Sequence, residues 1–213
     1  MSDAPVWEFV PGRFGRRAPT PGLLVREYTD FALASVLALR GQEWAAALAA
    51  EQAFGTLLPT QPRAAAGRDI EFIWSGPGHW LALAESSAQD IEAQLAGPLA
   101  GLTSVFDQSD SRVMLELHGA KVREVLAKGV ALDLHPRSFG MGDTALTTVS
   151  HFGVQLWQVA DAPVYRLLVV RSYFGSFWRW LAASAAEYGG EVLEARRHST
   201  RDSELVGLPA TNG

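Results

Sequence analysis

Two aspartates, Asp107 and Asp110, stand three residues apart in the segment Asp-Gln-Ser-Asp-Ser-Arg, which spans residues 107–112. Two neighbouring carboxylates could serve general acid–base chemistry, one holding the proton and the other accepting it. The same side chains also suit a tight turn, because aspartate and serine bond to nearby backbone amides. Arg112 and Arg123 are available to neutralise them. We favour the structural interpretation and expect no catalytic residue in this chain.

Metal and phosphate sites have little support in the sequence. The histidines show neither the i, i+4 spacing of a helical metal pair nor a nearby cysteine or carboxylate pattern; they are His79, His118, His135, His151 and His198. No glycine-rich dinucleotide or P-loop motif occurs, and Gly76-Pro77-Gly78 fits a hairpin turn better than a phosphate cradle. We therefore expect no metal, flavin or NAD bound by this chain.

Composition places the chain among ordinary soluble proteins. It has 213 residues, of which 48% are hydrophobic, and a net charge of −5 that argues against nucleic-acid binding. The absence of cysteine excludes disulfides and thiol catalysis and fits a reducing cytoplasm. No apolar stretch approaches the ~18 residues that span a bilayer. Asp3 and Glu8 stand where a signal peptide would be basic and then apolar, so we expect a cytoplasmic protein away from membranes.

The pattern of elements predicts an α+β fold with a largely antiparallel sheet, built from two ferredoxin-like βαββαβ-type halves. In the first half, alternating or apolar runs predict strands over residues 23–28, 31–39, 70–74, 80–84 and 103–107. An alanine-rich helix over 42–54, with Trp44 and Leu48 as core residues, and a helix over 87–95 capped by Ser87 lie between them. Together these give the split βαβ order.

The second half repeats the theme. Strands are predicted over residues 112–118, 144–150, 153–160 and 164–170, and helices over 121–128 and 172–188. In the first of these strands Val113, Leu115 and Leu117 share an apolar face, while Glu116 and His118 point to the other side, which could be solvent or another layer. We expect a single domain over residues 23–190, with halves of about 23–108 and 109–190, and a C-terminal tail over 191–213.

Residues 1–22 contain enough proline and glycine to prevent a regular helix or strand, so they are expected to form an extended arm. Trp7 with Arg13, Arg16 and Arg17 suits docking on a partner, although a frayed terminus is the other possibility.

Three more residues are candidates for a partner interface. His135 and Arg137 lie in a loop where Pro136 restrains His135 to an extended conformation, and either a partner contact or loop packing would fit. Trp180 lies off the apolar face of the last helix, where it could seal a loop or enter a subunit interface.

Six segments form a recognisable set: Asp-Gln-Ser-Asp-Ser-Arg at 107–112, Leu-Ala-Lys-Gly at 126–129, Leu-Asp-Leu-His-Pro-Arg at 132–137, Gly-His-Trp-Leu-Ala-Leu at 78–83, Arg-Ser-Tyr at 171–173 and Phe-Trp-Arg-Trp-Leu at 177–181. Through them the chain resembles one family, the gamma subunit of heterotetrameric sarcosine oxidase, over roughly residues 24–188. That family is in turn similar to the folate-binding domain of glycine-cleavage aminomethyltransferases, which have a comparable Asp-x-Ser segment. Two departures are the Gly-Pro-Gly-His loop before Trp80, where family members often have an acidic residue, and the extension beyond Tyr188.

The resemblance implies a folate-binding-domain-like fold docked on an alpha subunit, in a complex that also holds beta and delta subunits. It implies that FAD, FMN, NAD and tetrahydrofolate lie on partner subunits, and that the complex demethylates sarcosine to glycine with formation of hydrogen peroxide and one-carbon transfer to tetrahydrofolate. This chain would then serve assembly and stability.

Two alternatives stay open at this stage. A free-standing tetrahydrofolate-dependent aminomethyltransferase would need a buried carboxylate, such as Asp107 or Asp110, in an apolar pocket. A folate-domain maturation factor would act transiently on another enzyme, but such factors usually carry a cysteine-containing motif, which this chain lacks.

Overall fold

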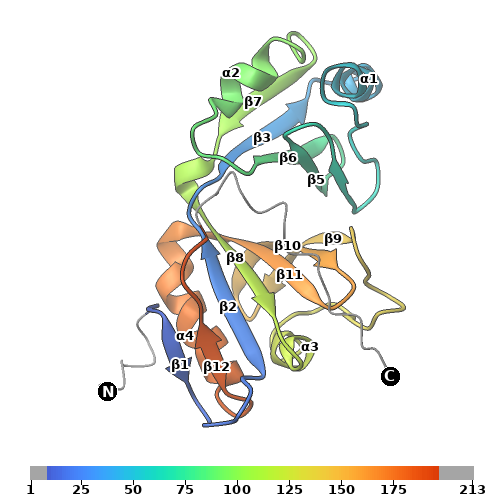
Figure 1. The fold of residues 1–213 in the computed structure, drawn as a ribbon. Coiled ribbons are helices and arrows are strands. Elements are labelled where there is room, and N and C mark those ends of the chain that lie inside the picture. The colour runs from blue at the N-terminus through green and yellow to red at the C-terminus, as the bar shows by residue number, and fades with distance from the viewer. Residues whose placement is uncertain (1–8, 197–213) are drawn as a thin grey trace, which may run out of the picture.

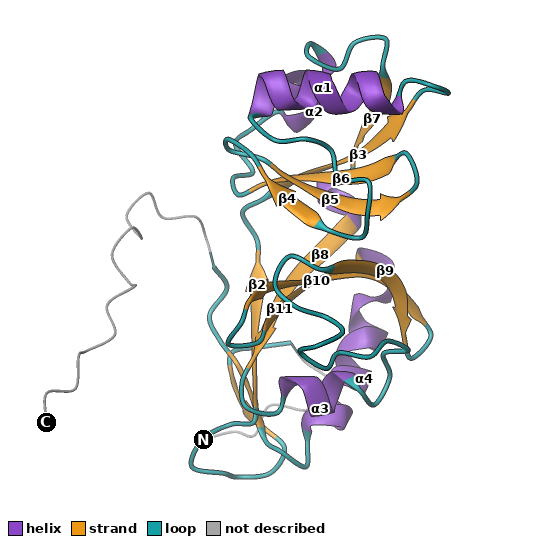
Figure 2. Cartoon of the chain, turned by 90° about the vertical axis from the view of Figure 1, so that its right-hand side faces the viewer, coloured by secondary structure: helices purple, strands orange, loops and turns teal. Residues whose placement is uncertain are grey.

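The alternating strands form two sheets that pack face to face, with helices on both outer sides (Figures 1 and 2). The computed structural model describes residues 9–196. Two helices, α1 (Glu43–Phe54) and α2 (Ile91–Ala96), cover one sheet. Two others, α3 (Val122–Leu126) and α4 (Phe174–Ala185), cover the second sheet. The order of layers is therefore helix, sheet, sheet, helix.

The larger sheet has seven strands in the described part of the chain, in the order β1-β12-β2-β8-β11-β10-β9. Neighbours are antiparallel except the parallel pair β12–β2. Its strands are β1 (Gly12–Phe14), β2 (Leu23–Tyr28), β8 (Arg112–His118), β9 (Thr144–Val149), β10 (Phe152–Ala160), β11 (Val164–Val170) and β12 (Gly190–Val192).

The smaller sheet has five described strands in the order β4-β5-β6-β3-β7, all antiparallel. They are β3 (Ala32–Ala38), β4 (Ala64–Ala66), β5 (Glu71–Gly76), β6 (His79–Ala84) and β7 (Thr103–Asp107). Short 3₁₀ turns at Ser109–Ser111 and Arg171–Tyr173 precede β8 and α4.

Alternation along each strand builds three apolar cores. On β8, Val113, Leu115 and Leu117 face α3 and α4, whereas Met114 faces the other sheet. Trp157 and Leu168 join Met114 in the layer between the sheets. Glu116 lies on the same face of β8 as Met114, because strand side chains alternate. Glu116 therefore points toward the smaller sheet and not into open solvent.

The alanines of α1 pack directly on the smaller sheet. Ala46, Ala47 and Ala50 are buried against small residues of β3, which allows helix and sheet to approach closely. Gly55 ends the helix with a positive φ of 75°, a conformation that glycine adopts without strain. Trp44 and Leu48, predicted as core residues, are instead 67% and 38% exposed, because three alanines and Phe54 form the inner face of the helix.

Other expectations for the first half need correction. The strand Leu23–Tyr28, counted with the first half, pairs with β8 and β12 in the larger sheet. The helix expected from Ser87 begins at Ile91, because Asp90 accepts a bond from the Ala93 amide as its N-cap, while Ser87 binds Asp30.

Both ends of the described chain are more regular than expected. Gly12–Phe14 forms β1, so the proline and glycine content of the arm does not prevent a short strand. Gly190–Val192 inserts as β12 between β1 and β2, and the Arg196 amide donates to Glu27. The last helix ends at Ala185, three residues before the predicted end.

Candidate functional site

Asp107 and Asp110 help to build the connection between the two sheets. Asp107 Oδ1 accepts the Ser109 amide at 2.7 Å, and Ser109 Oγ accepts the Leu33 amide at 2.9 Å. The carbonyl of Asp110 accepts Arg171 Nε at 2.7 Å. The segment thus forms a side-chain-stabilised turn that links β3, β7 and β8, as the structural interpretation predicts.

A cavity of about 410 Å³ lies at this connection. Its walls include Glu27, Asp107, Asp110 and Arg171, so its charge is mainly negative. Burial raises the pKa of Glu27, while Arg171 acts in the opposite direction. These residues offer carboxylates and one guanidinium, and among the cavity walls there is no histidine or lysine to act as a base.

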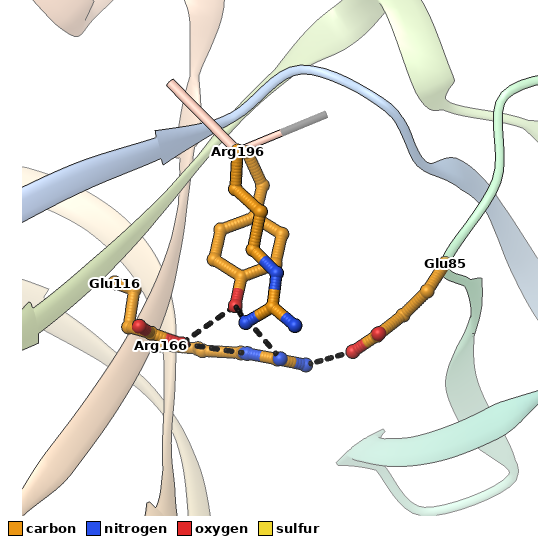
Figure 3. Close-up of polar contacts among 5 residues, drawn as sticks. Glu85, Glu116, Arg166 and Arg196 are labelled. Atoms are coloured by element: carbon orange, nitrogen blue, oxygen red, sulfur yellow. Dashed lines mark hydrogen bonds and ion pairs between the residues drawn. The ribbon is translucent and has the colours of Figure 1, made fainter. Parts of the chain in front are cut away.

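A second polar group lies between the sheets and centres on Arg166 of β11 (Figure 3). Arg166 Nη1 lies 2.8 Å from Glu85, and its Nε lies 3.6 Å from Glu116 of β8. Tyr28 donates its hydroxyl to Glu116 at 2.8 Å and accepts Arg196 Nη1 at 3.0 Å. The guanidinium of Arg166 also stacks 4.8 Å from the Tyr28 ring centre.

The electrostatics of this Arg166 cluster are balanced. Burial acts to lower the pKa of Arg166, but Tyr28 and Glu85 together raise it above its usual value, so the guanidinium stays charged. Burial also raises the pKa of Tyr28, which keeps the phenol protonated as a donor. The cluster therefore connects the two sheets. Within it, the positive charge of Arg166 is neutralised by the carboxylates of Glu85 and Glu116.

A cavity of about 420 Å³ opens beside Arg166. Glu71 and Glu85 contribute carboxylates to its walls, and Gln89 contributes an amide. Burial raises the pKa of Glu71, an effect that nearby Arg166 partly opposes. The walls are again mainly acidic, and Ser86 supplies a hydroxyl.

The third cavity is different in character, because aromatic rings and prolines line it. It measures about 310 Å³ and lies between α1 and the β5–β6 hairpin. Its walls are Glu43, Trp44, Ala47, Leu58, Pro59, Thr60, Trp74, Pro77, Gly78 and Trp80. We call this the tryptophan groove.

Of the residues predicted for a partner interface, the described ones of the arm are exposed, although the arm itself packs on the chain. Trp7 lies outside the described residues. Arg13 Nε binds Glu191 at 3.2 Å, and the Arg16 amide donates to Ala186 at 2.7 Å beyond the end of α4. Arg16 and Arg17 are exposed. The described part of the arm therefore packs along α4 and presents three arginines, Arg13, Arg16 and Arg17, to solvent.

His135 and Arg137 are both exposed in the loop after α3. Asp133 organises this loop by accepting the His135 amide at 2.9 Å and the Ser138 hydroxyl at 2.7 Å. His135 Nδ1 accepts the Arg137 amide at 3.2 Å. The loop is internally bonded, and it leaves the Arg137 side chain and the His135 ring at the surface.

Trp180 seals the end of α3. Its ring lies so close to Gly129 that a Cβ there would be 2.4 Å from Trp180 Cζ2. It also lies 5.8 Å from the Phe177 ring and packs on the core between α3, α4 and the larger sheet. Arg13, Arg16, His135, Arg137 and Trp180 are all on the larger-sheet half, but the described contacts do not join them into one cluster.

Within residues 9–196, no group of three or more histidine, aspartate or glutamate side chains has a metal-binding arrangement. Over the same residues, none of the helices has the length and apolar character needed to cross a membrane.

Comparison with known proteins identifies the family. The model of the "Sarcosine oxidase, gamma subunit family" matches residues 40–187. The chain belongs to the sarcosine oxidase gamma subunit family. It is 34% identical to the sarcosine oxidase subunit gamma of Corynebacterium sp. (strain P-1), over 79% of this chain and 83% of that protein. It is 33% identical to the Arthrobacter sp. protein, over 80% of this chain and 84% of that one.

Solved structures agree with this membership. A chain of the heterotetrameric sarcosine oxidase from Corynebacterium sp. U-96 superposes with a TM-score of 0.67 at 29% identity, covering 78% of this chain and 85% of that one. The glycine cleavage system aminomethyltransferase T from Bartonella henselae gives a TM-score of 0.59 at 12% identity, over 82% of this chain and 48% of the enzyme. The predicted fold class, α+β of the aminomethyltransferase type, is confirmed.

Sequence reasoning missed the Arg166 cluster and the tryptophan groove. One signal was available for the first: Arg166 interrupts the inner face of an otherwise apolar strand, and a charge at such a position requires a partner. The groove could not be foreseen, because Trp44 was predicted as a core residue and only the packed structure shows that its ring is left outside.

Proposed function

We propose that this chain is the gamma subunit of a heterotetrameric sarcosine oxidase and docks on the alpha subunit, with beta and delta subunits in the same assembly. The complex would oxidise sarcosine to glycine, form hydrogen peroxide and pass the one-carbon unit to tetrahydrofolate. FAD, FMN, NAD and tetrahydrofolate would be held by the partner subunits. The family membership, shared over most of the chain, carries this proposal.

The role proposed for this chain is structural. Asp107 is used in a turn, and Arg166 is used to join the two sheets. Two serines on the wall of the 410 Å³ cavity, Ser87 and Ser109, are bonded to Asp30 and to the Leu33 amide, which supports a structural role. Stabilising a multi-subunit enzyme needs only a firm fold and exposed docking groups.

Exposed Arg16, Arg17, His135 and Arg137 remain proposed interface residues, as do Trp7, Arg13 and Trp180. A single domain over residues 23–190 and a cytoplasmic location are part of the same proposal. The absence of cysteine is consistent with that compartment.

The test is co-expression of this chain with its genomic neighbours, with a tag on the chain, followed by size exclusion, mass spectrometry and flavin absorbance of each fraction. We expect a yellow complex that oxidises sarcosine and contains this chain in equal amount to the other subunits. The chain separated from that complex should be colourless. Asp107→Asn and Asp110→Asn should leave kcat/KM of the assembled complex within about twofold. A chain that stays alone, binds tetrahydrofolate and loses an aminomethyl-transfer activity in these variants would overturn the proposal.

A further inference from the structure

The tryptophan groove has an exposed ring that the fold does not use. Trp44 is 67% exposed, while α1 packs on the sheet through Ala46, Ala47, Ala50 and Phe54. Removing the indole would therefore leave the core unchanged. A large aromatic side chain held at the surface beside a hollow is typical of a binding hot spot.

The walls of the groove are rigid. Trp80 is buried and donates Nε1 to the Pro59 carbonyl at 2.8 Å, which fixes the loop after α1. A Cβ on Gly78 would lie 3.6 Å from Glu43 Cγ, so the tip of the β5–β6 hairpin touches the start of α1. Figure 2 shows α1 lying across the outer side of the smaller sheet, away from the larger one. Binding here would need little ordering of the groove itself.

Charge is distributed unevenly between the two halves of the chain. Residues 29–108, which contain the smaller sheet and its helices, hold nine acidic side chains and three arginines, a net charge of −6, while the whole chain carries −5. One of the three, Arg63, already pairs with Asp143 at 2.5 Å. Glu43 lines the groove, and Glu51 is exposed further along α1. Of these acidic side chains, Glu71, Glu85 and Asp107 line the other two cavities, so a basic segment is complementary to Glu43 at the groove and to Glu51 further along α1.

The shape favours an extended apolar segment. Flat rings and prolines forming a narrow hollow are the surfaces on which proline-containing chains dock, because a polyproline-type segment loses little conformational entropy on binding. A groove of about 310 Å³ has room for a few side chains and not for a whole helix face.

We propose that the tryptophan groove binds a proline-containing segment flanked by lysine or arginine, supplied by another subunit of the oxidase complex. The inference rests on the proposed function, since it adds a second docking surface for that assembly, on the smaller-sheet half and separate from the interface residues proposed above. Trp44 supplies the stacking ring and Glu43 supplies the charge at the rim.

The experiment measures binding of the full chain to an immobilised complex of the other three subunits. Trp44→Ala should weaken binding at least tenfold, and Glu43→Lys should weaken it severalfold, most strongly at low salt. Tyr173→Ala is the matched control, because Tyr173 is 56% exposed but lies at the start of α4. Unchanged melting temperatures would show that each variant is folded.

A photocrosslinking residue in place of exposed Thr60, on the groove wall, identifies the occupant. We expect one crosslinked peptide that contains proline and a basic residue. Wild-type-like binding by Trp44→Ala, or a crosslink to a segment without these residues, overturns this inference and leaves the subunit assignment intact. Failure of the wild type and of Tyr173→Ala to bind the other subunits overturns the proposed function and this inference together.

Discussion

Arg166 of β11 lies 2.8 Å from Glu85, which follows β6 of the other sheet, so one ion pair spans the boundary between the two sheets. The side chain of Arg166 is 12% exposed and that of Glu85 is 45% exposed. On its other side Arg166 faces Glu116, whose side chain is 12% exposed. Arg166 is therefore shared by a largely buried carboxylate, Glu116, and a more exposed one, Glu85. We expect the free energy of unfolding to depend on these two interactions unequally.

Replacing Arg166 should show how much stability is lost when the largely buried carboxylate of Glu116 has no cation beside it. Arg166→Met keeps the apolar part of the side chain but leaves Glu116 without its neighbouring cation, and we expect unfolding free energy to fall by about 3 kcal/mol. Glu85→Gln removes the more exposed partner and should cost no more than about 1 kcal/mol. Urea denaturation of the isolated chain measures both. Equal losses for the two variants would contradict this order.

Glu71 gives a prediction for pH dependence. Burial raises its pKa, with Arg166 opposing and Glu85 adding to the rise. Because the folded-state pKa lies above the unfolded value, Glu71 contributes most to stability below its unfolded pKa, and this contribution is lost as pH rises through the folded pKa. Glu71→Gln should thus become more stable relative to wild type between pH 4 and pH 7.

The control for this pH series is the same Glu-to-Gln change at an exposed position. Glu51→Gln removes an exposed carboxylate on α1 and is the control for losing one negative charge without losing a partly buried group. Chemical denaturation at each pH provides the comparison. A Glu71→Gln difference that is flat or shrinks as pH rises would show that burial is not what controls this carboxylate.

Gly129 and Trp180 should be coupled. A Cβ at Gly129 would lie 2.4 Å from the Trp180 ring and 3.0 Å from the Ser150 amide nitrogen. We expect Gly129→Ala to lower unfolding free energy by about 2 kcal/mol, the usual range for overpacking. In a Trp180→Ala background the same change should cost less, because the closest clash is gone. Additive losses in this double-mutant cycle would mean that the ring does not limit the site.

The sequence predicted local structure better than it predicted assembly of the elements. Strands such as Arg112–His118 and Val164–Val170 have the expected bounds, because alternating apolar residues are a local signal. The sheet joined by Leu23–Tyr28 could not be read in this way, since pairing with β8 and β12 depends on residues far along the chain. Likewise, Trp44 looks like a core residue until Ala46 and Ala50 are seen to fill the inner face of α1.

The same limit applies to the candidate site. The turn role of Asp107 followed from its short side chain, and the structure places it on the Ser109 amide. Arg166 could be recognised as unusual in its strand, but its partners come from three different elements separated widely in sequence. A local pattern can indicate that a charge needs a partner, and only the fold supplies it.

The last prediction concerns the arm, whose proline and glycine content suggested an irregular segment. In the structure Phe14 of β1 pairs with Gly190 of β12, and a Cβ on Gly190 would lie 2.1 Å from the Phe14 ring. The ring also meets Trp178 of α4 edge-on, with centres 5.2 Å apart. Phe14→Ala should therefore remove both the cover over the glycine and the aromatic contact, at a cost of about 2 kcal/mol in unfolding free energy.

Val10→Ala is the control, because Val10 is in the same segment but 39% exposed and should cost less than about 0.5 kcal/mol. Thermal melting of the two variants against wild type decides between a strand and a loose arm. If Phe14→Ala melts at the same temperature as Val10→Ala, β1 contributes nothing to the fold. If it melts well below, the arm from Gly12 onward is part of the larger sheet, and a partner would meet the exposed Arg13, Arg16 and Arg17 on a segment held by the fold.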